Sequence, residues 1–239
     1  MSLEEAPFRL VALSAGTSEP STSRMLVDRA AQATSTHLKE SGCNISIAVI
    51  ELAPMAAEIA QSLVTGFPQE KVQQAIEKVA QADAVIVATP VYKAGISGLF
   101  KSFIDLLDND LLVAKPVLLT ATAGTARHAM VIDEQMRPLF AFLRTLTAPT
   151  SVFAAPEDWG SAELGQRIDR AAFEMATLIS SRVGSTIAES GWSKYQHQFA
   201  GNATRSERTS EDTDFTTDLM KLARGQSLSS QSFKNSKDK

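Results

Sequence analysis

AVIVATPVYKAGISGLFKSFIDLL, residues 84–107, joins an apolar segment, a short loop and a helical pattern. The apolar segment, residues 84–88, is continuous, as in a strand that is buried on both faces of a parallel sheet. The loop that follows it runs from Thr89 to Ser97 and leads into the helical pattern. Open α/β sheets bind ligands at the carboxyl ends of their strands. The loop from Thr89 to Ser97 is therefore the first candidate for a binding site.

Strand and helix patterns alternate along the rest of the chain. Strands are predicted at residues 8–14, 45–52, 84–89, 116–122 and 150–154. Helices are predicted at residues 21–41, 54–65, 68–81, 97–108, 131–146 and 162–188. This alternation predicts an α/β protein with a parallel sheet and helices on both faces, and right-handed crossovers leave few topologies. We expect a flavodoxin-like doubly wound five-stranded sheet of order 2-1-3-4-5, with its switch point between the first and third strands.

The composition excludes several classes of protein. Of 239 residues, 44% are apolar and 21% are charged, and the net charge of −4 lacks the basic excess of a nucleic-acid-binding protein. No apolar run reaches the length of a membrane helix, and the N-terminus has no secretory signal, so we expect a cytoplasmic protein without membrane contact. The single cysteine, Cys43, fits a reducing compartment and is expected to be structural or incidental rather than a nucleophile. We predict no metal site.

The composition becomes polar beyond about residue 190. We therefore predict one flavodoxin-like domain at residues 1–190 and a polar, partly disordered C-terminal extension at residues 191–239. Within the extension, apolar residues at helical spacing indicate a short helix at residues 214–224 that could dock on the domain or on a partner.

The loop after the first strand, AGTSEPSTSR at residues 15–24, has the features of a phosphate site. Five of its ten residues carry hydroxyl groups, Gly16 permits a tight turn, and a helix starts within it. A phosphate binds to such hydroxyls, to unpaired backbone N–H groups and to a helix N-terminus. Both the P-loop motif and G-x-G-x-x-G are missing, which favours a single terminal phosphate. The alternative is that Ser21 and Thr22 merely cap the helix.

Two further loops suit a planar ring. The loop after the third strand offers the flat side chain of Tyr92, and the loop after the fourth, TATAGTARH at residues 120–128, offers small residues beside backbone N–H groups. Each could also be an ordinary connection. Together with the phosphate loop they favour a mononucleotide that carries a large planar ring. Lys93 and His128 are weak candidates for a direct catalytic role, and we assign no other catalytic residue.

Three groups of residues also resemble a known family. They are Gly16-Thr17 with the Ser-rich loop, the string ATPVYKA at residues 88–94 with Ser97-Gly98 and Lys101, and Ala123-Gly124-Thr125 with His128, Asp133 and Arg137-Pro138. In these residues the chain resembles the NAD(P)H-dependent FMN reductases, above all those that supply reduced FMN to sulfonate monooxygenases. The resemblance covers about residues 8–185.

The resemblance implies a flavodoxin-like fold and hydride transfer from NADPH or NADH to FMN. It implies that the FMN phosphate is held by Thr17, Ser21, Thr22 and Ser23. It places the ring beside two strand ends and their loops, at Thr89, Pro90, Val91, Tyr92, Lys93, Thr122, Ala123, Gly124 and Thr125. It further implies a homodimer or homotetramer and a flavin-dependent monooxygenase as a partner. Many relatives have an arginine where this chain has Ser18-Glu19, and that departure indicates loose flavin binding.

Other functions remain open on the sequence. A flavodoxin-type electron carrier would have a more acidic surface than a net charge of −4 provides. A quinone or azo-dye reductase would share the fold and the loops. An interaction module would use the helix at residues 214–224. The nucleotide preference is also open, because Arg24, Arg127 and Lys93 are each plausible partners for the 2′-phosphate of NADPH.

Overall fold

The computed structural model describes residues 6–189. Its strands are β1 (Phe8–Ser14), β2 (Ile45–Glu51), β3 (Ala84–Tyr92), β4 (Gly95–Ile96), β5 (Pro116–Thr122), β6 (Leu146–Thr147) and β7 (Val152–Ala154). Its α-helices are α1 (Thr22–Glu40), α2 (Ala56–Thr65), α3 (Glu70–Gln81), α4 (Gly98–Ile104), α5 (Arg137–Phe142), α6 (Ala162–Ser180) and α7 (Val183–Ile187). Short 3-10 turns η1 (Ala53–Met55), η2 (Ala126–His128) and η4 (Pro156–Gly160) and a π turn η3 (Ile132–Met136) complete the elements. The C-terminal extension and its predicted helix lie outside the described residues.

The sheet is parallel along the order β2-β1-β3-β5-β6, and β7 also pairs with β5. The fifth position is therefore shared by two short strands, because β6 pairs with the start of β5 and β7 with its end. The predicted α/β fold with its doubly wound order is confirmed. Among the strand pairs of residues 6–189, only β3–β4 is antiparallel. No helix within residues 6–189 is long and apolar enough to span a membrane.

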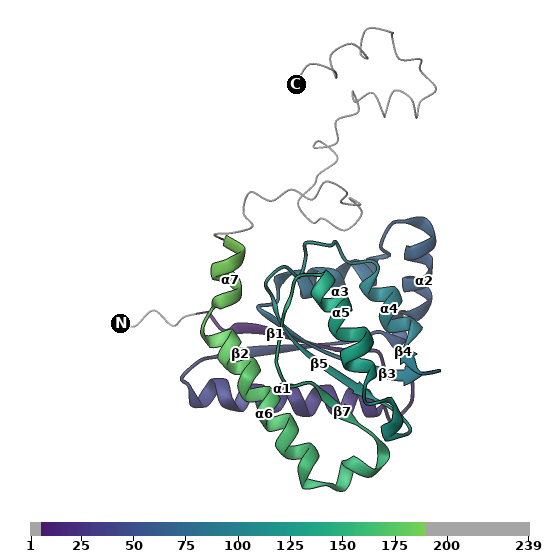
Figure 1. Ribbon diagram of the computed structural model, residues 1–239. Coiled ribbons are helices and arrows are strands. Elements are labelled where there is room, and N and C mark those ends of the chain that lie inside the picture. The colour runs from purple at the N-terminus through teal and green to yellow at the C-terminus, as the bar shows by residue number, and fades with distance from the viewer. Residues whose placement is uncertain (1–5, 190–239) are drawn as a thin grey trace, which may run out of the picture. The chain divides into compact units, whose positions relative to one another are not determined.

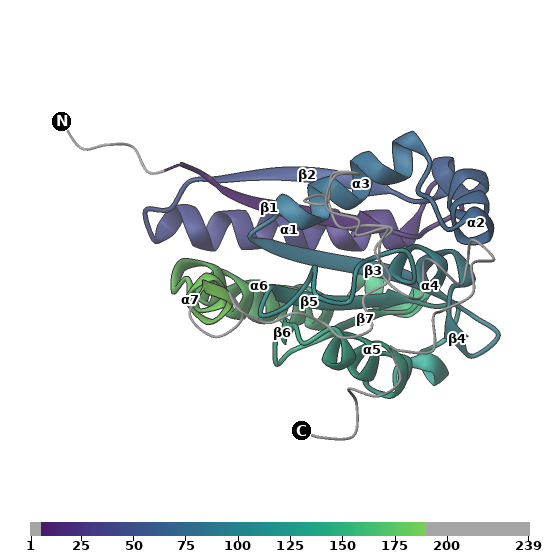
Figure 2. The ribbon, with the colours of Figure 1, turned by 90° about the horizontal axis from the view of Figure 1, so that it is seen from above.

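Helices cover both faces of the sheet (Figure 1). Helices α1 and α6 pack on one face, where Leu26 and Met175 meet Ile86 of β3 in an apolar cluster. Helices α2 to α5 pack on the other face, where Phe100 and Phe140 belong to a second cluster. Because successive side chains of a strand point to opposite faces, β3 supplies residues to both clusters and is buried almost throughout. Seen from above, strands β2, β1, β3 and β5 lie side by side in that order (Figure 2).

Strand β3 is longer than the sequence predicts. It continues past Thr89 to Tyr92 and turns back through Lys93 and Ala94 into β4. Both turn residues have positive φ, 50° and 62°, as in the tight turns that match the twist of a hairpin. Such turns usually carry Asn-Gly or Asp-Gly, so Lys93-Ala94 gives no sequence signal. The predicted loop at this position is in fact a short hairpin.

The helix predicted at residues 131–146 is also interrupted. Its first part is the π turn η3, in which the N–H of Arg137 donates to the carbonyl of Ile132, five residues earlier. Pro138 lies in the first turn of α5 and has no N–H, so the regular helical hydrogen bonds cannot pass through it. Helix α5 then ends at Phe142, and Arg144 adopts a positive φ of 57° before β6.

The long helix predicted at residues 162–188 is broken near its end. Helix α6 stops at Ser180, Arg182 has a left-handed φ of 52°, and α7 starts in a new direction at Val183. Gly184 of α7 lies against the backbone of Ala114, where a Cβ atom would be 2.4 Å from the carbonyl oxygen. The break thus brings the backbone of α7 onto the segment that enters β5.

We expect Gly184→Ala to lower the free energy of unfolding by about 1–3 kcal/mol, because its methyl group would overlap a backbone carbonyl that cannot rotate away. Gly165→Ala is the matched control, since a Cβ at this helical position meets no atom within 4 Å. It should be neutral or stabilise the protein by up to about 1 kcal/mol. Urea unfolding measures both, and equal stability of the two variants would contradict the packing of α7.

Lys115 connects β5 to the end of α3. Its ammonium donates to the carbonyls of Val79 and Ala80, at 2.7 and 2.8 Å. Burial lowers the pKa of Lys115 from 10.5 to about 8, and the nearby carboxylate of Asp83 opposes that shift. The folded state therefore releases a proton that the unfolded chain retains between about pH 8 and 10.5.

Stability should rise with pH across that window, because the unfolded state holds the extra proton. We expect the stability of the wild type relative to Lys115→Met to increase by on the order of 2 kcal/mol from pH 8 to pH 10.5. Urea unfolding of both proteins at several pH values measures this difference. The titrations of all other groups cancel, because the two proteins share them. A difference that is flat or falls with pH would contradict the lowered pKa.

Candidate functional site

Three loops meet at the carboxyl edge of the sheet. They are the loop after β1 (residues 15–21), the β3–β4 hairpin (residues 89–97) and the loop after β5 (residues 123–128). Strand β3 lies between the other two strands, with Ser14 opposite Ala88 and Pro90 opposite Thr122. The three loops that the sequence singles out are therefore neighbours, and Figure 1 shows the hairpin β4 projecting at this edge.

The loop after β1 presents unpaired backbone donors. The N–H groups of Thr17, Ser18, Ser21, Thr22 and Ser23 find no acceptor within residues 6–189. The hydroxyl of Ser21 caps α1 by accepting from the N–H of Arg24 at 3.1 Å. A Cβ on Gly16 would lie 1.9 Å from that hydroxyl oxygen, so the tight turn needs glycine. Unpaired N–H groups at a helix start form a cradle for an anion.

A hydrogen bond joins the first two loops. The hydroxyl groups of Thr17 and Tyr92 lie 2.9 Å apart, although the residues are 75 positions apart in the sequence. Both side chains are exposed, and Tyr92 remains 49% accessible. This contact lies across the boundary between β1 and β3, which is the switch point of the sheet.

The loop after β5 offers donors of the same kind. The N–H groups of Gly124 and Thr125 have no acceptor within the described chain, whereas the N–H of Ala123 donates to the carbonyl of Ala154. The Thr125 hydroxyl accepts from the N–H of Arg127 at 3.4 Å. The partly exposed ring of His128 follows, and none of its nitrogens bonds within residues 6–189.

Three of the predicted site residues are buried and already paired. The hydroxyls of Ser23 and Thr122 lie 2.7 Å apart and join α1 to the end of β5. The Thr89 hydroxyl bonds to the backbone N–H of Ser97 and to its hydroxyl group. These side chains fix the ends of the strands, while Thr17, Thr22, Tyr92, Lys93 and Gly124 lie exposed around them.

The cations near this edge differ in their surroundings. Arg24 is held by Asp28 at 2.8 Å and by Glu51 at 2.6 Å. The hydrogen bond to Asp28 is the main cause that raises the pKa of Arg24. Lys93 and Arg127 have no side-chain partner within residues 6–189. Of the three residues considered for a 2′-phosphate, Arg24 is therefore already neutralised and the other two are available.

One residue that supports the site was missed in the sequence. Gln135, in the π turn, donates to the carbonyl of Ala94 and accepts from the N–H of Ile96, both at 3.1 Å. A lone glutamine in a helical pattern gives no signal for such a contact, because the π turn that positions it is itself not predictable from periodicity.

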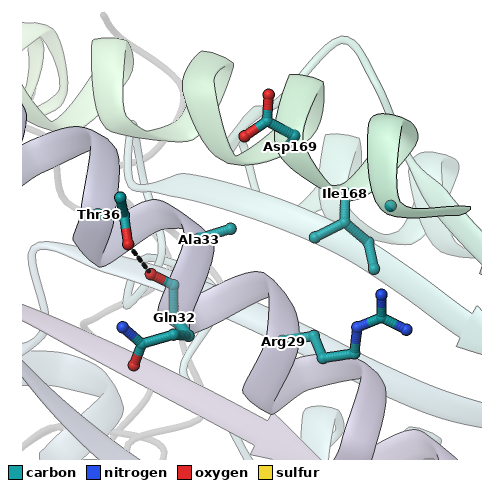
Figure 3. A pocket seen from close by; sticks show the side chains of 7 residues that line it. Arg29, Gln32, Ala33, Thr36, Ile168 and Asp169 are labelled. Atoms are coloured by element: carbon teal, nitrogen blue, oxygen red, sulfur yellow. Dashed lines mark hydrogen bonds between the residues drawn. The ribbon is translucent and has the colours of Figure 1, made fainter. Parts of the chain in front are cut away.

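A shallow groove elsewhere lies between α1 and α6, on their solvent side (Figure 3). Ile168 forms part of its lining, with Arg29 and Asp169 among the polar side chains around it. None of the predicted site residues lines this groove. The predicted site residues lie in the carboxyl-edge loops and on the strand ends beside them, away from this groove.

The arrangement fits a flavin mononucleotide. The first loop supplies neutral donors for a phosphate, and the glycine that shapes it cannot be replaced without displacing the Ser21 cap. The aromatic side chain of Tyr92 and the N–H groups of Gly124 and Thr125 can border a planar ring with polar edges.

Comparisons with known proteins agree with the family resemblance found in the sequence. Residues 8–160 match the family model of NADPH-dependent FMN reductase. The chain is 41% identical over 180 residues to the NADH-dependent FMN reductase SfnE of Pseudomonas putida, an alignment covering 73% of this chain and 94% of that protein. It is 38% identical to an FMN reductase (NADPH) of Pseudomonas aeruginosa, across 74% of this chain and 95% of that one.

A solved structure shares the same architecture. An oxidoreductase from Corynebacterium diphtheriae superposes with a TM-score of 0.71 at 39% identity, covering 73% of this chain and 98% of that chain. The apo form of an NADH:FMN oxidoreductase, EmoB, superposes with a TM-score of 0.63 at 24% identity, across 71% of this chain and 89% of that chain, which supports the fold. Taken with the family model and the curated relatives, these findings show that the chain belongs to the NADPH-dependent FMN reductase family.

Proposed function

We propose that this chain is an NAD(P)H:FMN oxidoreductase whose flavin site lies between the three carboxyl-edge loops. The observation that carries the proposal is the 2.9 Å contact between Thr17 and Tyr92, because it brings the phosphate cradle and the ring-facing hairpin together. Relatives named as FMN reductases, at up to 41% identity, support the reaction.

The phosphate of FMN would bind at the start of α1. The backbone N–H groups of Thr17, Ser18 and Ser21 find no acceptor in the described part of the chain, and the side chains of Thr17 and Thr22 are exposed. Ser21 acts through its cap, which holds the first turn of the helix. Ser23 is buried against Thr122, so its part is to fix the cradle and not to contact the anion.

The ring would lie between the hairpin and the loop after β5. Pro90, Tyr92 and Lys93 would form one wall, and Ala123, Gly124 and Thr125 the other, on strand ends fixed by Thr89 and Thr122. The predicted Val91 is buried in the core, so its side chain would support the hairpin from behind. FMN, when bound, supplies the chemistry by accepting a hydride from the reduced nicotinamide. The protein residues position the ring, exclude water and donate hydrogen bonds from Gly124 and Thr125 to its polar edge. The ammonium of Lys93 adds positive charge near that edge. His128 is a weaker candidate for a catalytic role.

The hydride donor is either NADH or NADPH. The relative from Pseudomonas putida is described as NADH-dependent and that from Pseudomonas aeruginosa as an NADPH enzyme. Lys93 and Arg127 would be the partners of a 2′-phosphate, since Arg24 is already paired with two carboxylates.

The family resemblance also leads to expectations about the compartment, the oligomeric state and the partner of the protein. We propose that the enzyme acts in the cytoplasm as a homodimer or homotetramer and supplies reduced FMN to a flavin-dependent monooxygenase. A single cysteine in 239 residues supports a reducing compartment. We expect FMN to bind loosely and to leave as a substrate, and the absence of a free cation within the loop after β1 supports this expectation.

Purified protein should oxidise NADH or NADPH when FMN is added, with loss of absorbance at 340 nm and bleaching of the flavin under nitrogen. Turnover with free FMN in excess separates a reductase from an electron carrier, and competition by quinones or azo dyes tests those acceptors. If FMN binds and neither nucleotide is oxidised, the proposal is wrong.

Gly16→Ala should weaken FMN binding about 10-fold, because its methyl group would displace the Ser21 hydroxyl that caps α1. Quenching of flavin fluorescence measures the Kd. Gly165→Ala, where a Cβ has free space, should leave the Kd unchanged. Unaltered FMN affinity in Gly16→Ala would remove the loop after β1 from the site.

A further inference from the structure

The β3–β4 hairpin needs support from outside itself. Its two central residues, Lys93 and Ala94, both have positive φ, a conformation that costs a residue with a Cβ atom free energy. Strand β4 has only two residues, so few hydrogen bonds of the sheet hold it. The hairpin nevertheless carries Tyr92, whose hydroxyl bonds to Thr17 across the switch point.

Gln135 supplies that support from another segment. Its amide group donates to the carbonyl of Ala94 and accepts from the N–H of Ile96, so it binds the backbone on both sides of Gly95. A Cβ on Gly95 would lie 3.2 Å from Oε1 of Gln135, which shows how closely the amide approaches the strand. Among residues 6–189, no other side chain makes a hydrogen bond to the backbone of residues 92–96.

The π turn positions this glutamine. A π turn accommodates one residue more per turn than an α-helix and therefore changes the direction of the side chains that follow. Ile132 and Met136 of the turn are buried in the core, and Gln135 lies between them in sequence, half-buried, toward the hairpin. The turn begins at Ile132, four residues after the loop after β5 ends at His128. Gln135 thus joins the chain segment of one ring-facing wall to the backbone of the other.

We propose that Gln135 is a positioning residue that sets the affinity for FMN by holding the β3–β4 hairpin, without touching the flavin. The inference rests on the proposed function, because the hairpin is taken as one wall of the flavin site. Gln135 holds the main chain of residues 94–96. This contact in turn fixes the positions of Tyr92 and Lys93, which border the flavin site.

The test compares Gln135→Met, which has a similar length and makes neither hydrogen bond, with two controls. Gln73→Met is the matched control, since Gln73 is a half-buried helical glutamine whose amide bonds to Glu77 at 3.0 Å, away from the site. In the double variant Gln135→Met/Ala94→Gly, glycine adopts the positive φ at position 94 without the cost of a Cβ atom, while the glutamine remains absent.

Three kinds of experiment are made. Fluorescence quenching gives the Kd of FMN, amide hydrogen exchange is followed at residues 92–96 in the FMN-free protein, and steady-state kinetics give kcat and the KM for FMN. In Gln135→Met we expect the Kd, the KM and the exchange rate each to rise about 10-fold, with kcat at saturating FMN within about twofold of wild type. Gln73→Met should match the wild type. Ala94→Gly in the double variant should recover most of the FMN affinity, which a general loss of stability would not allow.

An unchanged Kd and unchanged exchange in Gln135→Met would overturn the proposal. So would equal losses in Gln73→Met, or a fall in kcat with no change in FMN affinity. If Gln135→Met does not fold, Gln135→Glu is measured instead: it keeps the acceptor for Ile96 but cannot donate to Ala94, so faster exchange with weaker FMN binding supports the proposal and wild-type values overturn it. A wild type that binds FMN but oxidises neither nucleotide refutes the proposed reaction, while the Kd and exchange still test Gln135.

Discussion

The parallel pairing of β1 with β3 is the constraint on which the rest of the structure depends. The connection from β1 through α1 to β2 covers one face of the sheet, and the connection from β2 through α2 and α3 to β3 covers the other. The two loops that leave β1 and β3 therefore separate at the carboxyl edge and leave space between them. Thr17 and Tyr92 meet across that space, so one strand pairing determines where a ligand can bind.

The strands that are buried in the core could be predicted from their apolar sequences. The turns and helix breaks that need an unusual backbone conformation could not. Strands β1, β3 and β5 carry apolar runs that are buried in the core, and their predicted places in the sheet, together with that of β2, were confirmed. The hairpin depends on positive φ at Lys93 and Ala94, the π turn on Pro138, and the end of α6 on Arg182. Positive φ values and a π turn leave no periodic pattern in the sequence.

The candidate site shows the same division. Hydroxyl-rich and small-residue loops indicated which segments form it, and all three lie at one edge as expected. The sequence did not distinguish the exposed side chains from the buried ones, Ser23, Thr89 and Thr122, whose hydroxyls pair inside the protein. Residue type indicates a possible donor, whereas burial determines whether that donor is free to meet a ligand.

The ion pairs of Arg24 have a consequence for how the enzyme responds to its solution. Arg24 is the cation in the first turn of α1, and it is shared between Asp28 and Glu51. If FMN binds as proposed, the loop after β1 would hold its phosphate through amide and hydroxyl dipoles, whose attraction acts over short distances. Counter-ions weaken charge–charge attraction far more than such contacts. In the proposed binding mode, the contribution of this loop to FMN affinity would therefore depend little on salt concentration.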